Sequence, residues 1–430
     1  MTLSPRQVKI LIIVALVGVF LFVAIFTGFR PQKSQIPRLV FWSPYEEPVV
    51  FEDLITRYTQ ENEVKIEYVL KNPATYEQEL IDSLAAGVGP DIFVINNSWL
   101  PKHGNKLYPA PPDIISSRDV QEIYPEVVFR DFVAGDRVYA LPLSVDTLAL
   151  FYNQSLLDQV GIVFPPKTWE ELVVDVPKLT KINQAGLIER SAISLGTSNN
   201  VLHAADILSL LMMQLGSNMS DPEKLEVTFQ KSTGLQSIGG EALQFYTRFA
   251  QAKEKLYTWN RDLPNSQDAF SRGELAMFLG YARDIKTVRQ KAPYLDFRIT
   301  QAPIVAAMSG RVDYANYWGY AVSRTSRYPK EAWKFIGWLN ELNQARTYMR
   351  KANLPPARRE LIREVMDEPI LGVFARQALT AKSWYQPDPE AVNLIFKSMI
   401  DDVNFGRFTP EEAVKHAANQ INLLFKKYSQ

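Results

Sequence analysis

The sequence predicts an α/β protein with two doubly wound lobes joined by several crossing segments, preceded by one transmembrane helix. Three observations lead to this prediction. Strand and helix patterns alternate from residue 39 onward, a strand-like run at residues 137–146 contains a proline, and residues 10–29 carry no charge. Alternating strands and helices imply right-handed crossovers and a parallel sheet.

The composition is that of an ordinary globular protein. The chain has 430 residues, of which 47% are hydrophobic and 22% charged, which is enough for two or three domains of about 100–200 residues each. Its 47 Lys and Arg balance its 47 Asp and Glu, so we expect no nucleic-acid partner. The absence of cysteine excludes disulfides, thiolate metal sites and a cysteine nucleophile.

Residues 10–29 are predicted to form an uncleaved membrane anchor. As a helix, this run would cross about 30 Å of hydrocarbon. Arg6 and Lys9 precede it, and it is longer than the apolar core of a typical cleaved signal. A cleaved signal is the main alternative, and a buried core helix is a weaker one. Residues 1–9 would precede the anchor, and the proline-containing residues 30–38 would be a linker.

The first lobe begins with a strand–helix–strand–helix–strand order. Apolar residues recur at helical or strand spacing in the following runs: strands at 39–42, 64–70 and 91–95, and helices at 50–58 and 76–85. Ligands of such sheets bind beyond the carboxyl ends of the strands. That rule selects two loops, residues 43–47 and 96–99, as candidate ligand contacts.

The run at residues 137–146 is predicted to carry the chain from one lobe to the other. Pro142 has no amide hydrogen, so the run is a poor central strand and a better edge or crossing segment. Asp146 falls where the chain changes lobe, which is where a ligand cleft would lie.

The remaining elements complete the two lobes. Thr168 and Glu171 have capping-box spacing at the start of a helix, and so do Thr409 and Glu412. The predicted division of the chain beyond the linker is first lobe 39–145, second lobe 146–302, a return to the first lobe at 303–356, and C-terminal helices of the second lobe at 357–430.

Enzyme motifs are missing from the sequence. The three histidines, His103, His203 and His416, have no metal-ligand spacing, and neither a nucleophile elbow nor a phosphate-binding glycine loop occurs. Glu46 and Asp146 could form an acid–base pair on a glycoside, but carboxylates also serve as simple acceptors for sugar hydroxyls. We therefore expect a protein that is not an enzyme and that has no cofactor and no metal.

Five blocks, in this order along the chain, resemble the extracellular solute-binding proteins of sugar importers, the maltose-binding-protein-like family. They are Ala85–Ile92, Tyr139–Pro142, Leu150–Asn153, Pro165–Leu172 and Ala269–Met277. The resemblance implies a periplasmic-binding-protein-like fold of type II, a carbohydrate ligand and an ABC permease as partner. It also implies an extracytoplasmic location of the lobes, so that residues 1–9 would be cytoplasmic. The lipid-bearing cysteine that many such proteins carry is absent.

A sugar site needs flat apolar faces and planar polar groups. We predict that such groups come from the ends of the strands and from the crossings, although each residue could instead serve packing or loop structure. The candidate ligand-binding residues are Trp42, Tyr45, Glu46, Asn97, Ser98, Trp99, Asp146, Tyr281, Arg283, Trp318, Trp384 and Tyr385. The guanidinium of Arg283 leaves a carboxylate or phosphate ligand open.

The sequence thus favours a membrane-tethered binding protein that encloses an oligosaccharide between its lobes and passes it to an ABC permease. The predicted hinge consists of residues 144–147, 302–305 and 354–357. Closure would be a population shift driven by a ligand that touches both lobes. A sensor or adhesion subunit on the same scaffold and a non-sugar solute are the alternatives.

Overall fold

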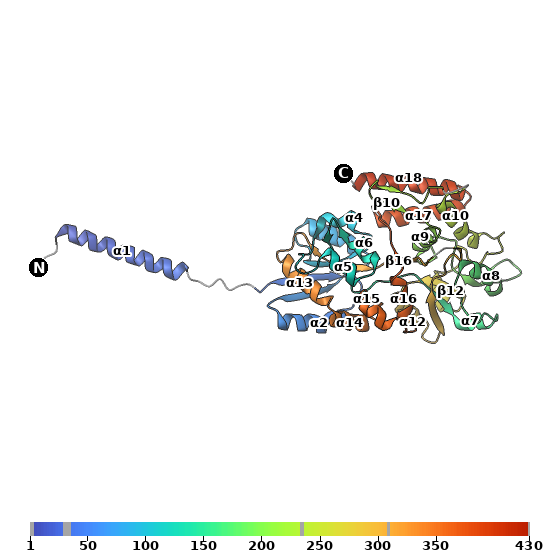
Figure 1. The fold of residues 1–430 in the computed structure, drawn as a ribbon, viewed down its shortest axis with the longest axis horizontal. Helices are drawn as coiled ribbons and strands as arrows, with labels where there is room; N and C mark the ends of the chain where they lie inside the picture. Colours follow the sequence, from blue (N-terminus) through green and yellow to red (C-terminus); the bar gives the residue numbers. More distant parts are fainter. Residues whose placement is uncertain (1–3, 29–35, 233–235, 308–309, 429–430) are drawn as a thin grey trace.

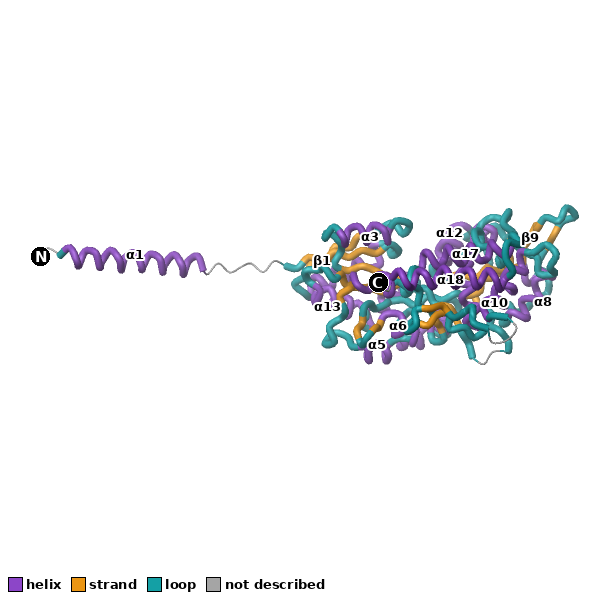
Figure 2. The backbone as a smooth tube through the Cα atoms, turned by 90° about the horizontal axis from the view of Figure 1, so that it is seen from above, coloured by secondary structure: helices purple, strands orange, loops and turns teal. Residues whose placement is uncertain are grey.

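The computed structural model describes residues 4–28, 36–232, 236–307 and 310–428. Figures 1 and 2 show two lobes side by side, with β1, α3 and α13 in one and α8, α10 and β9 in the other. The predicted two-lobed α/β architecture is therefore confirmed.

The predicted anchor coincides largely with the N-terminal helix α1 (Pro5–Gly28). Within the described residues, no helix is both long enough and apolar enough to cross a membrane. The structure thus does not support the predicted transmembrane helix at residues 10–29. Most of the predicted linker lies outside the described residues, and its last residue, Arg38, begins β1.

The first lobe is built on a five-stranded sheet with the order β2-β1-β3-β15-β4. β1 is parallel to both β2 and β3, as predicted, whereas β15 is antiparallel to β3. The strands are β1 (Arg38–Ser43), β2 (Lys65–Leu70), β3 (Ile92–Asn96), β4 (Leu107–Tyr108) and β15 (Trp318–Ser323). The helices are α2 (Pro48–Glu61), α3 (Tyr76–Ala85), α4 (Leu100–His103), α5 (Ser117–Ile123), α6 (Glu126–Phe132), α13 (Pro329–Leu339), α14 (Leu342–Ala352) and α15 (Arg359–Val365), with the hairpin β5 (Val133–Ala134) and β6 (Arg137–Val138).

The second lobe has a mixed sheet with the order β13-β7-β12-β9-β8. Only β12 and β9 pair in parallel, so this sheet is less regular than the predicted doubly wound one. The strands are β7 (Ala149–Asn153), β8 (Lys181–Ile182), β9 (Ile188–Ile193), β12 (Leu275–Gly280) and β13 (Phe297–Gln301), with a separate pair β10 (Ser220–Asp221) and β11 (Glu226–Val227). The helices are α7 (Gln154–Asp158), α8 (Trp169–Leu179), α9 (Ala204–Gln214), α10 (Ile238–Thr247), α11 (Ser266–Ser271), α12 (Asp284–Lys291), α17 (Pro389–Asn404) and α18 (Pro410–Tyr428).

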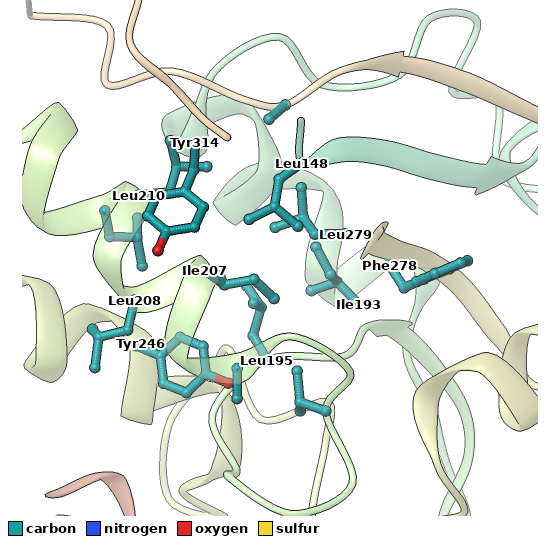
Figure 3. Packing of buried hydrophobic residues seen from close by; sticks show 14 of the residues in the cluster. Leu148, Ile193, Leu195, Ile207, Leu208, Leu210, Tyr246, Phe278, Leu279 and Tyr314 are labelled. Carbon is teal, nitrogen blue, oxygen red and sulfur yellow. The ribbon is translucent and has the colours of Figure 1, made fainter. Parts of the chain in front are cut away.

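Each lobe has its own hydrophobic core. In the second lobe, Ile207 of α9 lies beside Ile193 and Leu279 of the sheet (Figure 3). Both predicted caps are present: Thr168 Oγ1 accepts from the Glu171 amide at 3.1 Å, and Thr409 Oγ1 accepts from the Glu412 amide at 3.3 Å. Each buried Leu, Ile or Phe contributes about 1.5–3 kcal/mol, so each core contributes to the stability of its own lobe.

Within the described chain, three segments cross between the lobes, at residues 146–148, 313–316 and 380–382. They are hydrogen-bonded to one another. The Leu148 amide donates to the Tyr314 carbonyl and the Ala315 amide to the Lys382 carbonyl, both at 3.0 Å. β14 (Asp313–Tyr314) and β16 (Ala381–Lys382) pair in parallel, and α16 (Leu371–Ala378) lies just before β16. The crossings therefore form a short three-stranded ribbon.

Two of the three predicted hinge segments are wrong. Residues 302–305 do not cross, because β13 pairs with β7 as an edge strand and keeps the chain in the second lobe until Tyr314, which packs in the second core. Residues 354–357 contact both lobes, because Leu354 packs against the second core, but they do not carry the chain across, because α14 before them and α15 after them both pack in the first core. The predicted boundaries at 302/303 and 356/357 move accordingly to the second and third crossings.

Candidate functional site

A cavity of about 840 Å³ lies between the two lobes and the crossings. We call it the cleft. Its first-lobe lining includes Tyr45, Tyr76, Glu77, Asn96, Asn97, Ser98, Trp99, Lys102 and Trp318, and its second-lobe lining includes Asn199, His203, Asp206, Asn265, Arg283, Glu390, Asn393 and Lys397. Ala315, Asn316, Ser383 and Trp384 come from the crossing region. The volume is in the range of small-molecule sites, about 300–1,000 Å³.

The first-lobe wall is aromatic. Trp318 begins β15 opposite Asn96, the last residue of β3, so it lies beside the loop that carries Trp99. The Trp318 ring centroid is 5.1 Å from that of Trp99 and 4.8 Å from that of Tyr45. Tyr45 follows β1 and is 42% exposed, so its ring is accessible from the cleft. This wall offers ring faces of the kind that pack on the C–H face of a sugar.

A half-buried carboxylate holds the polar part of the same wall. Asp131 of α6 accepts hydrogen bonds from Asn97 Nδ2 at 3.0 Å, from Tyr317 Oη at 2.7 Å and from Ser383 Oγ. Burial raises the pKa of Asp131 to about 6, against the effect of these hydrogen bonds. Asn97 and Ser383 line the cleft, so Asp131 fixes two cleft residues from behind. Ser98 Oγ is held by Asn96 Oδ1 at 2.6 Å.

The second-lobe wall is polar and centred on Arg283. Its Nη2 donates to the Asn316 carbonyl at 2.9 Å, and its guanidinium lies 4.8 Å from the Tyr281 ring centroid. Asp206, in the first turn of α9, also faces the cleft and accepts from the Asn316 amide nitrogen Nδ2 at 3.2 Å. These planar groups can donate to and accept from sugar hydroxyls.

Asp146 and Tyr281 lie behind this wall and do not line the cleft. Asp146 is 5% exposed, accepts from the backbone amides of Ala282 at 2.9 Å and Arg283 at 3.2 Å, and lies 4.0 Å from Arg283 Nε. Tyr281 is fully buried, and its hydroxyl donates to Asp206 Oδ2 at 2.6 Å. Both residues therefore position a neighbour that does face the cleft.

Three other predicted residues lie outside the cleft. Trp42 packs under the Lys71 ammonium, which is 4.1 Å from its ring centroid. Glu46 accepts from Ser43 Oγ at 2.6 Å and from Tyr348 Oη at 2.8 Å, so it belongs to the first-lobe interior. The Tyr385 ring stacks on Phe425 with centroids 5.9 Å apart. The predicted residues that do line the cleft are Tyr45, Asn97, Ser98, Trp99, Arg283, Trp318 and Trp384; their contact with a ligand stays a prediction.

Sequence reasoning missed the contribution of α17. Glu390, Asn393 and Lys397 recur every three or four residues along this helix and line the cleft. Residues three or four positions apart lie on the same face of a helix. The spacing of these polar residues could therefore have indicated a polar face of α17, separate from its buried apolar face. His203, also missed, precedes α9 in the left-handed region with a φ of 62° and faces Asp284 Oδ2 from Nε2 at 2.9 Å. Such strained backbone is common near functional sites.

One lysine in the lining of the cleft joins the two lobes. The ammonium of Lys102, in α4, lies 2.9 Å from Glu77 Oε1 of the first lobe and 3.0 Å from Asp388 Oδ1, which caps α17 of the second lobe. Burial opposes its charge, but the hydrogen bonds to the two carboxylates prevail and raise the pKa of Lys102. We call Lys102, Glu77 and Asp388 the clasp.

We expect Lys102→Met to open the unliganded protein. Removing the ammonium breaks the clasp and leaves both carboxylates without this partner, so the closed form is less populated. Since partly exposed pairs contribute up to about 1 kcal/mol, ligand affinity should fall up to about fivefold. Small-angle X-ray scattering should show a larger radius of gyration than in the wild type. Lys106→Met in the same segment is the control, and an equal expansion in both variants would contradict the role of the clasp.

We expect Asp146 to shape the pH dependence of stability. Burial raises its pKa from 3.8 to about 6, against the pull of the Arg283 guanidinium. Between pH 3.8 and about pH 6, the folded state holds a proton on Asp146 that the unfolded state has released. The contribution of Asp146 to the free energy of unfolding therefore rises as the pH falls through about 6. Above that pH, the ionised and buried carboxylate lowers the free energy of unfolding.

The variant Asp146→Asn should therefore lose more stability on acidification from pH 7 to pH 4, relative to its own value at pH 7, than the wild type does. Urea unfolding at a series of pH values measures this slope. Asp367→Asn, at an exposed position, is the control and should leave the slope unchanged. If Asp146→Asn and the wild type had the same slope, the Asp146 carboxyl would have the same pKa in the folded and the unfolded protein, which would contradict this prediction.

The fold and the cleft together define a class: a two-lobed protein that binds a small solute between its lobes. Within the described ranges, no group of three or more His, Asp or Glu side chains is placed to hold a metal ion. The family model described as "Bacterial extracellular solute-binding protein" matches residues 43–341, well over half of the chain. The chain belongs to this family.

Individual relatives are distant. The chain is 24% identical over 380 residues to the "Probable ABC transporter-binding protein" of Deinococcus radiodurans, covering 84% of this chain and 86% of that one. It is 27% identical over 141 residues to the galactooligosaccharide-binding protein of Bacillus subtilis, covering 33% and 32%. The solved structure of the sugar-binding protein MalE from Xanthomonas citri superposes with a TM-score of 0.75 at 18% identity, covering 91% and 98%. That structural likeness shows the fold.

Proposed function

We propose that this protein captures an oligosaccharide in the cleft and delivers it to an ABC permease. The observation that carries the proposal is the pairing of an aromatic wall, with Tyr45 and Trp318, and a wall of planar polar groups around Arg283 across one cavity. A pyranose has an apolar C–H face and a rim of hydroxyls, and the two walls complement these two features. The names of the Bacillus and Xanthomonas relatives agree with this ligand class.

The charges of the cleft favour a neutral ligand. Its lining holds three carboxylates, Glu77, Asp206 and Glu390, and three cations, Lys102, Arg283 and Lys397. Lys102 is neutralised in the clasp, and Arg283 lies beside Asp146. A carboxylate or phosphate ligand would need a surplus of cations that this lining lacks, whereas a neutral sugar does not. This argument supports a carbohydrate over an anionic solute.

Delivery would follow from closure. A ligand that touches both walls stabilises the closed form by its difference in affinity for the two forms, and a permease that recognises this form then receives the ligand. We propose no catalytic step, because binding and closure suffice for this role. ATP hydrolysis would belong to the partner.

The family description supports an extracytoplasmic location for the lobes. Attachment to the membrane through residues 10–29 is a proposal supported only by the uncharged sequence of that run. Alkaline extraction of membranes tests it, because an anchored chain stays with the membranes, whereas a chain held by surface contacts is released.

A thermal-shift screen of the purified protein tests the ligand class. A ligand that binds only the folded state stabilises it by RT ln(1 + [L]/Kd), which is about 2.7 kcal/mol at a hundredfold excess over Kd. We expect gluco- or galacto-oligosaccharides to raise the melting temperature. A rise confined to amino acids, peptides or polyamines would reject the sugar assignment.

A further inference from the structure

Asn316, at the end of the second crossing, uses all four of its polar heavy atoms inside the protein. Its backbone amide donates to the Asp146 carbonyl at 3.0 Å, and its backbone carbonyl accepts from Arg283 Nη2 at 2.9 Å. In the side chain, Oδ1 accepts from Asn96 Nδ2 at 3.0 Å, and Nδ2 donates to Asp206 Oδ2 at 3.2 Å. Asn316 lines the cleft, but each of these atoms already has a partner in the protein.

The two side-chain hydrogen bonds of Asn316 lead to opposite walls of the cleft. Asn96 ends β3 of the first lobe, and Asp206 lies in the first turn of α9 of the second lobe. Both line the cleft. Ala315 and Tyr317, on either side of Asn316, pack in the first core. The bond to Asp206 therefore reaches from the first lobe to the second and depends on their relative orientation. We call the side chains of Asn96, Asn316 and Asp206 the link.

The link requires a side chain that donates and accepts at the same time. A carboxylate only accepts, so the Asp206 carboxylate holds Nδ2 of Asn316 toward itself and leaves Oδ1 for Asn96. A second carboxylate at position 316 would place two like charges at hydrogen-bond distance. Tyr281 Oη donates to the same Asp206 oxygen at 2.6 Å. The Asp206 carboxylate is thus held both from its own lobe and from the crossing.

We propose that Asn316 is a positioning residue for ligand binding, which holds Asn96 of one wall and Asp206 of the other in place for a ligand that contacts both. This inference rests on the proposed function and narrows it. Side chains that are fixed before binding lose less rotamer freedom when the ligand arrives, so the link raises the affinity. The ligand group at Asp206 is a hydrogen-bond donor such as a sugar hydroxyl, because a carboxylate only accepts.

Calorimetric titration of the full chain with maltotriose and with galactotriose tests the proposal. Asn316→Asp should weaken the binding of whichever probe the wild type binds by at least about tenfold, because two carboxylates then face each other. The double variant Asn316→Asp with Asp206→Asn returns one amide and one carboxylate to the link, with the direction of the hydrogen bond reversed. Its affinity should lie within about threefold of that of Asp206→Asn alone.

Asn316→Asp with Asp146→Asn is the matched control, because it has the same net charge as the first double variant. The Asp146 carboxylate accepts from the Ala282 and Arg283 amides and makes no hydrogen bond to the Asn316 side chain among the described residues. The affinity of this control should stay as low as that of Asn316→Asp.

Asn316→Ala decides the question if Asn316→Asp does not fold. Alone it should weaken binding by about tenfold, and in an Asp206→Ala background it should weaken binding by less than about twofold. Urea denaturation of each variant separates affinity from stability.

Losses of stability without a change of affinity, or equal recovery in both double variants, would show that Asn316 does not position ligand-binding groups and would overturn this inference. A wild-type protein that binds neither probe nor any other sugar would instead overturn the proposed function.

Discussion

Replacing Gln377 by leucine is expected to lower the free energy of unfolding by about 3–5 kcal/mol. Gln377 lies at the end of α16 with no exposed surface. Its Nε2 donates to Thr147 Oγ1 at 2.9 Å and to the Leu148 carbonyl at 2.7 Å, and its Oε1 accepts from the Ala302 amide at 2.8 Å. A leucine would fill the space but leave these buried groups unpaired, at about 1–3 kcal/mol each.

Urea denaturation measures the change. Gln344→Leu is the matched control, because its side chain is also buried but makes one long hydrogen bond, to Glu341 Oε2 at 3.2 Å, and should cost less than about 1 kcal/mol. Equal losses for the two variants would show that the hydrogen bonds of Gln377 at the crossings contribute no more to the free energy of unfolding than the single hydrogen bond of Gln344 does. A loss confined to Gln377→Leu would place the stability of the two-lobed arrangement in these crossings.

Replacing Trp318 by alanine is expected to weaken ligand binding by about a hundredfold. Trp318 contacts Tyr45 and Trp99 and forms the centre of the aromatic wall. Truncating a central aromatic anchor of an interface typically costs about 2–4 kcal/mol. Titration with the best sugar from the thermal-shift screen measures the effect, and Trp318→Phe should recover part of the affinity.

Trp42→Ala is the control for this experiment. Trp42 precedes the same loop as Tyr45 but lies outside the cleft, under Lys71. The variant Trp42→Ala should lower the free energy of unfolding. At a temperature where Trp42→Ala and Trp318→Ala are both folded, Trp42→Ala should bind the sugar with the affinity of the wild type. If Trp42→Ala weakened binding as much as Trp318→Ala, the aromatic wall would not be the ligand contact.

The sequence predicted the parts of the site that follow from local order. Tyr45, Asn97, Ser98 and Trp99 follow β1 and β3, and the rule for parallel sheets places such loops at one edge, beside the cleft. Trp318 joins them because β15 pairs with β3 in the register that puts it opposite Asn96. That register depends on residues far apart in the chain, so the position of Trp318 was less predictable than those of the loop residues.

The sequence could not show which polar residues lie behind others. Asp146 and Arg283 both come at the ends of strand-like runs, and either could have faced the ligand. In the structure, the Ala282 and Arg283 amides bind the Asp146 carboxylate and turn it inward. The crossings were misplaced for a similar reason, because nothing local in Phe297–Gln301 reveals that it pairs with β7.

The positions of the crossings bear on how the chain acquires its structure during synthesis. The first core includes Ala378 and Ala381, and the second core includes Ile421 and Phe425. Neither core is complete before residues 378–381 of the first core and 421–425 of the second core have been synthesised. A chain truncated before residue 375 is therefore expected to lack part of both cores and to be less stable than the full chain.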